Sequence, residues 1–278
     1  MNVVIIGGAA ALIDQAAAVT GASATHQTGV GVWRLEAPAI RAARRARLRD
    51  LCEIARADVF FIDTPRALTS MKLAVMDMDS TLITIECIDE IADMQGLKPQ
   101  VSAITAAAMR GELDYPASLR RRVALLKGLP VDALERVYHE RLRLSPGAET
   151  MLAAFHAAGL KTLLVSGGFT FFTSRLQQRL GIDYTASNTL GIESGRLTGE
   201  VVGEIIDAEV KRRTLIETCA RIGCTSADAI AIGDGANDLK MMGAAGISIA
   251  YRAKPVVRAQ ATHAINHNGL DAVPYLFA

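Results

Sequence analysis

The stretch LAVMDMDSTLITIECIDE, residues 73–90, decides the fold of this chain. Its first four residues are apolar, as expected for a strand of a parallel sheet that is buried on both faces. Charged residues follow only where such a strand has ended, so we place Asp77 and Asp79 on the loop that leaves it. Their spacing of two lets both carboxylates approach one site. A lone aspartate there would most often cap a turn, but two of them, followed by Thr81, indicate a functional site.

The chain beyond this stretch alternates between strand and helix patterns, which predicts an α/β fold with a Rossmann-like parallel sheet. Residues 86–142 are instead helical with charged faces, and we interpret about 84–145 as a helical cap inserted after the first core strand. The carboxyl end of that strand is the edge where open α/β sheets bind ligands. We expect further strands at 161–166, within 184–203, at 229–233 and, as the last strand, at 246–250, and helices at 148–158, 170–180, 208–222 and 236–244.

The first 66 residues predict a separate small domain. Strand patterns at 2–6, 23–27, 28–36 and 58–63 and two intervening helices give the order β-α-β-β-α-β of a ferredoxin-like module. Residues 64–72 are a plausible linker, so the second domain would span 72–278. No sharp motif accompanies the first domain. Ligand binding at the Gly7-Gly8 turn and simple dimerisation or packing are equally compatible with its sequence.

Three further motifs follow core elements. The sequence GDGAND at 233–238 comes after a buried strand, Ser166-Gly167-Gly168 precedes a helix, and Lys211 lies near the start of another helix. Each motif also has an ordinary structural explanation: GDGAND could be a simple turn, Ser-Gly-Gly a strand-to-helix connection, and the lysine a solvated surface residue. All three motifs would lie at one edge of the predicted sheet, which favours a functional site. The Ser-Gly-Gly turn adds free N–H groups at a helix N-terminus, and such groups bind anions.

The acidic residues of these loops indicate a metal. Carboxylates that lie close together repel each other and are stabilised by a cation. Mg²⁺ prefers oxygen ligands and commonly joins a protein to a phosphate. We therefore expect Asp77 and Asp79, together with Asp234 and Asp238, to form a Mg²⁺ site.

The combination of these motifs is more specific than its parts. Asp-x-Asp-x-Thr, Ser-Gly-Gly, a lysine and Gly-Asp-Gly-x-Asn-Asp, in this order, resemble the haloacid dehalogenase superfamily of phosphotransferases. The stretches EIADMQG (90–96), LDYPASLRRRVALLKGLP (113–130) and LVSGGFTFF (164–172) are similar to its phosphoserine phosphatase family. The resemblance covers roughly residues 72–250 and implies a core and cap of the haloacid dehalogenase type. The first domain is similar in element order to the ligand-binding ACT-type module of longer members.

The resemblance implies a two-step phosphoryl transfer. Asp77 would attack phosphorus to give an aspartyl-phosphate, and Asp79 would protonate the leaving seryl oxygen and later activate water. Mg²⁺ would be held by the Asp77 carboxylate, the backbone carbonyl of Asp79 and Asp234, with Asp238 in support. Lys211 and the metal would offset the repulsion between a carboxylate and a phosphate.

Substrate contacts follow from the same resemblance. Ser166 and the Gly167 N–H would hold phosphate oxygens, and Asn237 would help to order the site. From the cap, Glu86 would pair with the substrate ammonium and Arg122 with its carboxylate, which the planar fork of an arginine suits. The neighbouring arginines at 120 and 121 remain alternatives. Tyr115 stands where the family usually has phenylalanine, which puts the detailed cap geometry in question.

Composition limits the partners. With 30 basic and 29 acidic residues the net charge is +1, which gives no electrostatic reason to expect nucleic acid or anionic membranes as the main partner. The basic run at 41–49 has helical spacing and predicts a solvated helix face. The four cysteines form no C-x-x-C motif, which favours reduced thiols in a cytoplasmic protein. The N-terminus predicts neither a signal peptide nor a membrane span, and His263 and His267 are interpreted as structural.

The resulting hypothesis is a Mg²⁺-dependent enzyme that hydrolyses phosphoserine, a small-molecule substrate, in the last step of serine synthesis. A phosphotransferase of the same architecture, with an alcohol such as homoserine as acceptor, has the same motifs. A non-catalytic amino-acid sensor is a third alternative, although a sensor would not need both Asp77 and Asp79. A homodimer through the first domain is compatible with the sequence.

Overall fold

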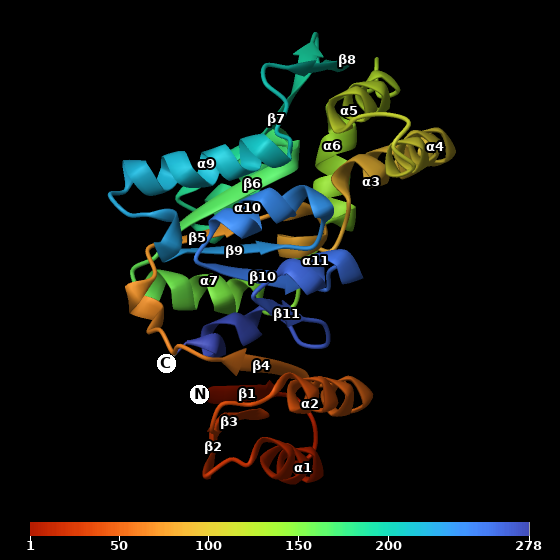
Figure 1. Ribbon diagram of the computed structural model, residues 1–278. Coiled ribbons are helices and arrows are strands. Elements are labelled where there is room, and N and C mark those ends of the chain that lie inside the picture. Colours follow the sequence, from red (N-terminus) through yellow and green to blue (C-terminus); the bar gives the residue numbers. More distant parts are fainter. Residues whose placement is uncertain (278) are drawn as a thin grey trace.

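The computed structural model describes residues 1–277 and contains two sheets at different levels of the molecule (Figure 1). The first sheet is antiparallel, with the strand order β2-β3-β1-β4, and it is covered on one face by two helices. This is the predicted ferredoxin-like element order. Its elements are β1 (Asn2–Ile6), α1 (Ala10–Thr20), β2 (Ala24–Gly29), β3 (Val32–Glu36), α2 (Ala42–Ile54) and β4 (Asp58–Ile62).

The second sheet has seven strands in the order β11-β10-β9-β5-β6-β7-β8, all parallel except the β7–β8 pair. The predicted α/β class is therefore confirmed. The strands are β5 (Leu73–Met76), β6 (Lys161–Phe169), β7 (Tyr184–Glu193), β8 (Arg196–Val202), β9 (Ala229–Gly233), β10 (Ile247–Tyr251) and β11 (His263–Ile265), and the helices are α7 (Ala148–Ala157), α8 (Thr170–Leu180), α9 (Ala208–Arg221), α10 (Leu239–Ala244) and α11 (Pro255–Gln260).

Strand β5 shows why the run LAVM had to be apolar. All four residues are buried, but alternate ones face opposite layers, because successive side chains of a strand point to opposite faces. Leu73 and Val75 pack in the cluster that contains residues of α9, α10 and α11, whereas Ala74 and Met76 pack with residues of α7 and α8. The central strand is thus sandwiched between two helical layers, and its polar residues appear only after Met76.

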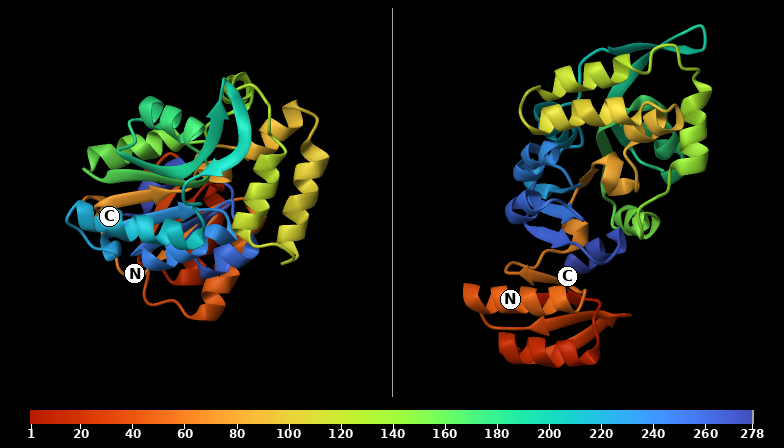
Figure 2. Two further views of the ribbon diagram at one scale, coloured as in Figure 1. Left: turned by 90° about the horizontal axis from the view of Figure 1, so that it is seen from above. Right: turned by 90° about the vertical axis from the view of Figure 1, so that its right-hand side faces the viewer.

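The helical block that follows β5 forms four α-helices: α3 (Cys87–Met94), α4 (Lys98–Met109), α5 (Tyr115–Ala124) and α6 (Asp132–Arg136). Gly96, Gly111 and Gly128 separate these helices, and each of these glycines has a positive φ that other residues rarely adopt. Asp114 begins α5 by accepting a hydrogen bond from the Ala117 N–H at 2.7 Å. These helices lie at the end of the molecule opposite the first sheet (Figure 2).

The β7–β8 hairpin supports the cap from the side. The Gly128 N–H donates to the Leu197 carbonyl at 2.8 Å, and the Leu197 N–H donates to the Leu129 carbonyl at 2.8 Å. These backbone hydrogen bonds connect the end of the cap directly to the β7–β8 hairpin.

The prediction that 246–250 is the last strand was wrong. Helix α11, strand β11 and a 3₁₀ segment at Leu270–Leu276 follow it. Apolar residues of this final segment pack in the same cluster as β1 and β4 residues that point away from α1 and α2. The first sheet is therefore buried on both faces, one of them against the C-terminal segment.

A buried carboxylate fixes this contact. Asp58, at the start of β4, is only 3% exposed and accepts hydrogen bonds from the backbone N–H groups of Asn266 (2.8 Å), His267 and Asn268 (2.9 Å). The Asn268 side chain donates a further bond at 2.8 Å. Hydrogen bonds to a charged group are stronger than neutral ones, so Asp58 anchors the N-terminal module to the core. Within residues 1–277, no helix has the length and apolar character needed to cross a membrane.

Candidate active site

The site is built around Asp77, the first residue after β5. Its side chain is buried, and its Oδ1 accepts a hydrogen bond from the Met78 N–H at 2.7 Å. The Asp77 N–H donates to the Ile232 carbonyl of β9 at 3.0 Å, so the backbone at Asp77 is tied to the neighbouring strand. Ser80, three residues on, has a φ of +56°, a conformation that is uncommon for residues other than glycine. The sharp turn sends the chain from β5 toward the cap.

Lys211 lies beneath Asp77. It comes from α9, is 1% exposed, and places its Nζ 2.8 Å from Asp77 Oδ1 and 2.7 Å from Asp238 Oδ1. Burial by itself would lower the pKa of Lys211, but the charges of Asp238 and Asp77 outweigh that effect and raise it. The lysine therefore stays protonated as a fixed positive charge in the floor of the site, and the interpretation of a solvated surface lysine is excluded.

The carboxylates around Lys211 carry more negative charge than this one lysine can balance. Asp77, Asp234 and Asp238 each offer a carboxylate oxygen, and these oxygens lie within 4.8 Å of one another. Burial, and then the charge of Asp238, raises the pKa of Asp234 to about 6. A cluster of hard oxygen donors with uncompensated negative charge fits a divalent cation. Thr81 holds one member of the cluster in place, since its hydroxyl donates to Asp234 at 3.1 Å.

Two glycines make the close approach of these carboxylates possible. A Cβ atom on Gly233 would lie 2.5 Å from the carboxyl group of Asp238, and one on Gly235 would lie 2.1 Å from the side-chain oxygen of Asn237. The Gly235 N–H also donates to Asp238 Oδ2 at 3.0 Å. The GDGAND sequence is thus specified by packing around the acidic cluster.

Among the residues that the structure describes, Asp79 does not belong to this acidic cluster. Its Oδ1 is buried with no hydrogen-bond partner among residues 1–277, and its Oδ2 faces Gly168, on which a Cβ would lie 3.1 Å away. Burial, with a contribution from the charge of Glu86, raises the pKa of Asp79 to about 8. A carboxyl group with this pKa is largely protonated at neutral pH, which suits a proton donor.

The Ser166-Gly167-Gly168 turn is organised from several elements. The Gly168 N–H donates to Ser166 Oγ at 2.8 Å. The Gly167 carbonyl accepts one hydrogen bond from the Asn188 side chain at 2.8 Å and another from the Tyr115 hydroxyl at 3.2 Å. Since Tyr115 belongs to the cap, its hydroxyl joins the cap directly to the turn opposite Asp77.

A cavity of about 500 Å³ lies between the core and the cap. Its lining includes eight of the ten predicted site residues: Asp77, Asp79, Glu86, Arg122, Ser166, Gly167, Asp234 and Asn237. The other two, Lys211 and Asp238, do not line it and are almost fully buried below its floor.

The cap contributes two acidic residues, Glu86 and Asp89, and the cationic Arg122 to this cavity. Glu86 accepts a hydrogen bond from the Ser80 hydroxyl at 2.7 Å, and burial raises its pKa. Arg122 is the only one of the three consecutive arginines that lines the cavity, and its buried Nε has no partner among residues 1–277. Arg120 and Arg121 are exposed.

Sequence reasoning missed two residues of the site. Lys254 lines the cavity just after β10, and its N–H lies 3.4 Å from the Asp234 carbonyl. A lysine at the carboxyl end of a parallel strand was a usable signal for it. Asn188 is fully buried in β7 and supports the Gly167 carbonyl. A single polar residue in a polar strand offered no comparable signal.

Comparison with known proteins agrees with this geometry. The sequence model of the haloacid dehalogenase-like hydrolase family matches residues 71–246. A phosphoserine phosphatase from Polaromonas sp. is 60% identical over 209 residues, which cover 73% of this chain and 89% of that protein. The chain belongs to the phosphoserine phosphatase family of haloacid dehalogenase-like hydrolases. The corresponding protein from Albidiferax ferrireducens is 56% identical over 77% of this chain and 92% of its own length.

Solved structures extend the similarity to the whole chain. A haloacid dehalogenase family hydrolase from Salmonella enterica is 35% identical with a TM-score of 0.90, and the match covers 99% of this chain and 98% of that one. A probable phosphoserine phosphatase from Vibrio cholerae, in unliganded form, is 36% identical with a TM-score of 0.86 over 99% of this chain and 85% of its own. The N-terminal sheet is therefore part of the shared architecture.

Proposed function

We propose that this chain hydrolyses O-phospho-L-serine to L-serine and phosphate, the last step of L-serine biosynthesis. The observation that carries the proposal is that one cavity joins two sets of groups. A buried carboxylate, Asp77, backed by Lys211, lies at its floor. Glu86 and Arg122, whose buried Nε has no hydrogen-bond partner among residues 1–277, line its cap side. This arrangement matches a small substrate that carries a phosphate at one end and an amino-acid group at the other. The family membership of the chain supports the same substrate class.

Asp77 would act as the nucleophile. Its carboxylate oxygen forms a bond to phosphorus while the bond from phosphorus to the seryl oxygen breaks, which leaves an aspartyl-phosphate. Asp79, whose buried Oδ1 has no hydrogen-bond partner among the described residues 1–277, gives its proton to the seryl oxygen. The same carboxylate then takes a proton from the water that attacks the aspartyl-phosphate, and phosphate is released.

The acidic cluster of Asp77, Asp234 and Asp238 fits Mg²⁺. The carboxylates of Asp77 and Asp234 and the backbone carbonyl of Asp79 would hold the ion, with Asp238 in support. When bound, this ion supplies positive charge that allows a carboxylate to approach a phosphate. Lys211 supplies a second, permanent positive charge from below.

Contacts to the two ends of the substrate would come from different elements. Ser166 and the Gly167 N–H, at the end of β6, would bind phosphate oxygens, and Asn237 would order the opposite side of the cavity. Glu86 would accept from the substrate ammonium, and Arg122 would bind its carboxylate through the planar fork of the guanidinium. The buried Nε of Arg122, which has no hydrogen-bond partner within the described part of the chain, supports this assignment.

A phosphate-release assay across phosphoserine, phosphothreonine and sugar phosphates tests the proposal. We expect phosphoserine to be preferred and Asp77→Asn to abolish turnover; activity that survives in this variant would refute the nucleophile assignment. Arg122→Ala should reduce turnover of phosphoserine far more than that of an aryl phosphate. The adjacent, exposed Arg121→Ala is the matched control.

Added homoserine tests the acceptor, because a transferase would release little free phosphate when homoserine is abundant. Protein that binds serine but does not turn over phosphoserine in Mg²⁺ would favour the sensor interpretation instead.

We further propose that the chain acts in the cytoplasm with its four cysteines reduced, and that residues 1–66 form a domain that supports a homodimer. Among residues 1–277 the cysteines are all free, and three of them are buried. The edge strand β2 of the first sheet has one unpaired side. Light scattering coupled to size exclusion would measure the mass, and a monomer at micromolar concentration would refute the dimer.

A further inference from the structure

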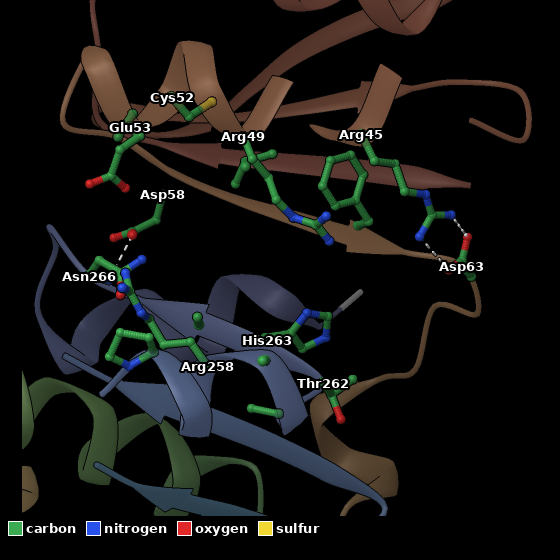
Figure 3. A pocket seen from close by; sticks show the side chains of 17 residues that line it. Arg45, Arg49, Cys52, Glu53, Asp58, Asp63, Arg258, Thr262, His263 and Asn266 are labelled. Atoms are coloured by element: carbon green, nitrogen blue, oxygen red, sulfur yellow. Dashed lines mark hydrogen bonds and ion pairs between the residues drawn. The ribbon is translucent and has the colours of Figure 1, made fainter. Parts of the chain in front are cut away.

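A second cavity lies where the N-terminal module meets the core. Its volume is about 630 Å³, and it opens between α2 and β4 on one side and α11 and β11 on the other (Figure 3). It shares no lining residue with the catalytic cavity. Volumes of this size are typical of sites for small molecules.

The three carboxylates that line this cleft already have partners. Asp58 accepts hydrogen bonds from the backbone of 266–268 and from the Asn268 side chain. Asp63 accepts hydrogen bonds from both Nη groups of Arg45, at 3.1 and 2.5 Å. Glu53 Oε2 lies 3.2 Å from His267 Nε2. The oxygens of these carboxylates are therefore engaged with groups other than Arg49 and Arg258.

Two arginines in the same cleft have no such partner. Arg49 comes from α2 and Arg258 from α11, so they project from opposite walls (Figure 3). Within residues 1–277, neither has a carboxylate oxygen within 4.0 Å of its guanidinium nitrogens, whereas Arg45, on the same helix as Arg49, is paired. The Arg49 guanidinium lies 5.1 Å from the centre of the Phe61 ring, a contact that restrains an arginine without using its hydrogen-bond donors.

The floor of the cleft adds a polar group without charge. His263 of β11 packs edge-on against Phe60, with ring centroids 5.9 Å apart, and its ring also lines the cavity. Burial lowers the pKa of His263 to about 4, so the imidazole is neutral at pH 7 and can donate one hydrogen bond and accept another.

We propose that this cleft binds a small oxyanion, a carboxylate or a phosphate group, held between Arg49 and Arg258. The planar guanidinium fork matches both kinds of oxyanion, and two forks from opposite walls can bind one anion from two sides. Because one arginine belongs to the N-terminal module and the other to the core, the ligand would bridge the two parts of the chain. The site is separate from the catalytic cavity and does not depend on its chemistry.

Calorimetric titration of the full chain, without substrate, tests this site with two probes. Succinate represents a carboxylate and inorganic phosphate represents a phosphate group. We expect at least one probe to bind in a way that Arg49→Ala and Arg258→Ala each weaken by about tenfold or more, since each removes charge-assisted hydrogen bonds. Arg47→Ala is the matched control, because Arg47 is exposed on the same helix but does not line the cleft.

The two probes also separate the sites. Phosphate bound in the catalytic cavity would persist in Arg49→Ala, whereas phosphate bound in the cleft would be lost. If binding of succinate requires the two arginines and binding of phosphate does not, the cleft is a carboxylate site. If only the binding of phosphate requires them, it is a phosphate site. The proposal is overturned if neither probe shows binding that depends on Arg49 and Arg258, or if Arg47→Ala weakens binding equally.

A second measurement needs no variant. The side-chain Nε–H resonances of Arg49 and Arg258 in ¹⁵N-labelled protein should shift together and saturate as the effective probe is added. Unchanged resonances at a concentration that saturates the calorimetric signal would also overturn the proposal.

Discussion

Replacing Lys211 by methionine tests how the buried charges of the active site are balanced. The lysine is 1% exposed, and its Nζ lies 2.8 Å from Asp77 and 2.7 Å from Asp238. Methionine has nearly the same volume, so the variant removes the charge without opening a large cavity. Two buried carboxylates are then left without their cation.

The expected cost follows from this geometry. Removing one partner of a buried ion pair costs about 3–5 kcal/mol, because the remaining charge is left uncompensated. Two lost hydrogen bonds to charged groups, at about 1.5–3 kcal/mol each, give a similar sum. We therefore expect Lys211→Met to lower the free energy of unfolding by about 3–5 kcal/mol and the melting temperature by about 10 °C.

Urea unfolding followed by circular dichroism, in the presence of a chelator, measures this loss. The matched control is Lys240→Met, because Lys240 is an exposed lysine 3.4 Å from Glu209, and exposed pairs contribute less than about 1 kcal/mol. The double variant Lys211→Met/Asp238→Asn should recover part of the loss, since one of the orphaned charges is gone. Added Mg²⁺ should also restore part of the stability of Lys211→Met. A loss no larger than that of the control, or no recovery in the double variant, would refute the charge-balance argument.

Three further predictions concern single contacts. Tyr115→Phe removes the hydroxyl bond to Gly167 but keeps the ring, so KM for phosphoserine should rise about fivefold in steady-state kinetics with little change in unfolding free energy. The pKa of His263 is lowered to about 4 from 6.5. As the pH drops, His263 therefore takes up a proton in the unfolded chain before it does so in the folded chain, and the free energy of unfolding falls between pH 6.5 and 4. His263→Phe removes this effect, so the urea midpoints at pH 7 and pH 4.5 should differ less than in the unaltered chain. Gly233→Ala places a Cβ 2.5 Å from the Asp238 carboxyl, so calorimetry should show much weaker Mg²⁺ binding to a chain that still has native circular dichroism.

The core of the fold could be predicted because its signals are local. The run LAVM and the acidic loop after it require a buried strand that ends at a site, and β5 has this structure. The role of the three consecutive arginines could not be settled in this way. Successive residues on a helix point about 100° apart, so one of them at most can face a given cavity. Only the orientation of α5 against the core selects Arg122.

The C-terminal part of the chain was predicted least well. Strand β11 has three residues, HAI, which is too short for a periodic pattern to appear. Its stability comes from β10 on one side and from contacts with the N-terminal module, which are distant in sequence. The four hydrogen-bond donors around Asp58 illustrate the same limit, since they lie more than 200 residues away from it in the sequence. Such pairing leaves no mark in a local stretch of sequence.

Helix α11 connects the two cavities of the molecule. Lys254, the residue before the helix, lines the catalytic cavity, whereas Pro255 and Arg258 line the cleft against the N-terminal module. The Lys254 N–H lies 3.4 Å from the Asp234 carbonyl, so the start of this short helix is also in contact with the acidic loop. Lys254 and Pro255, which are adjacent in the chain, therefore line different cavities, and this one short segment contributes to both of them.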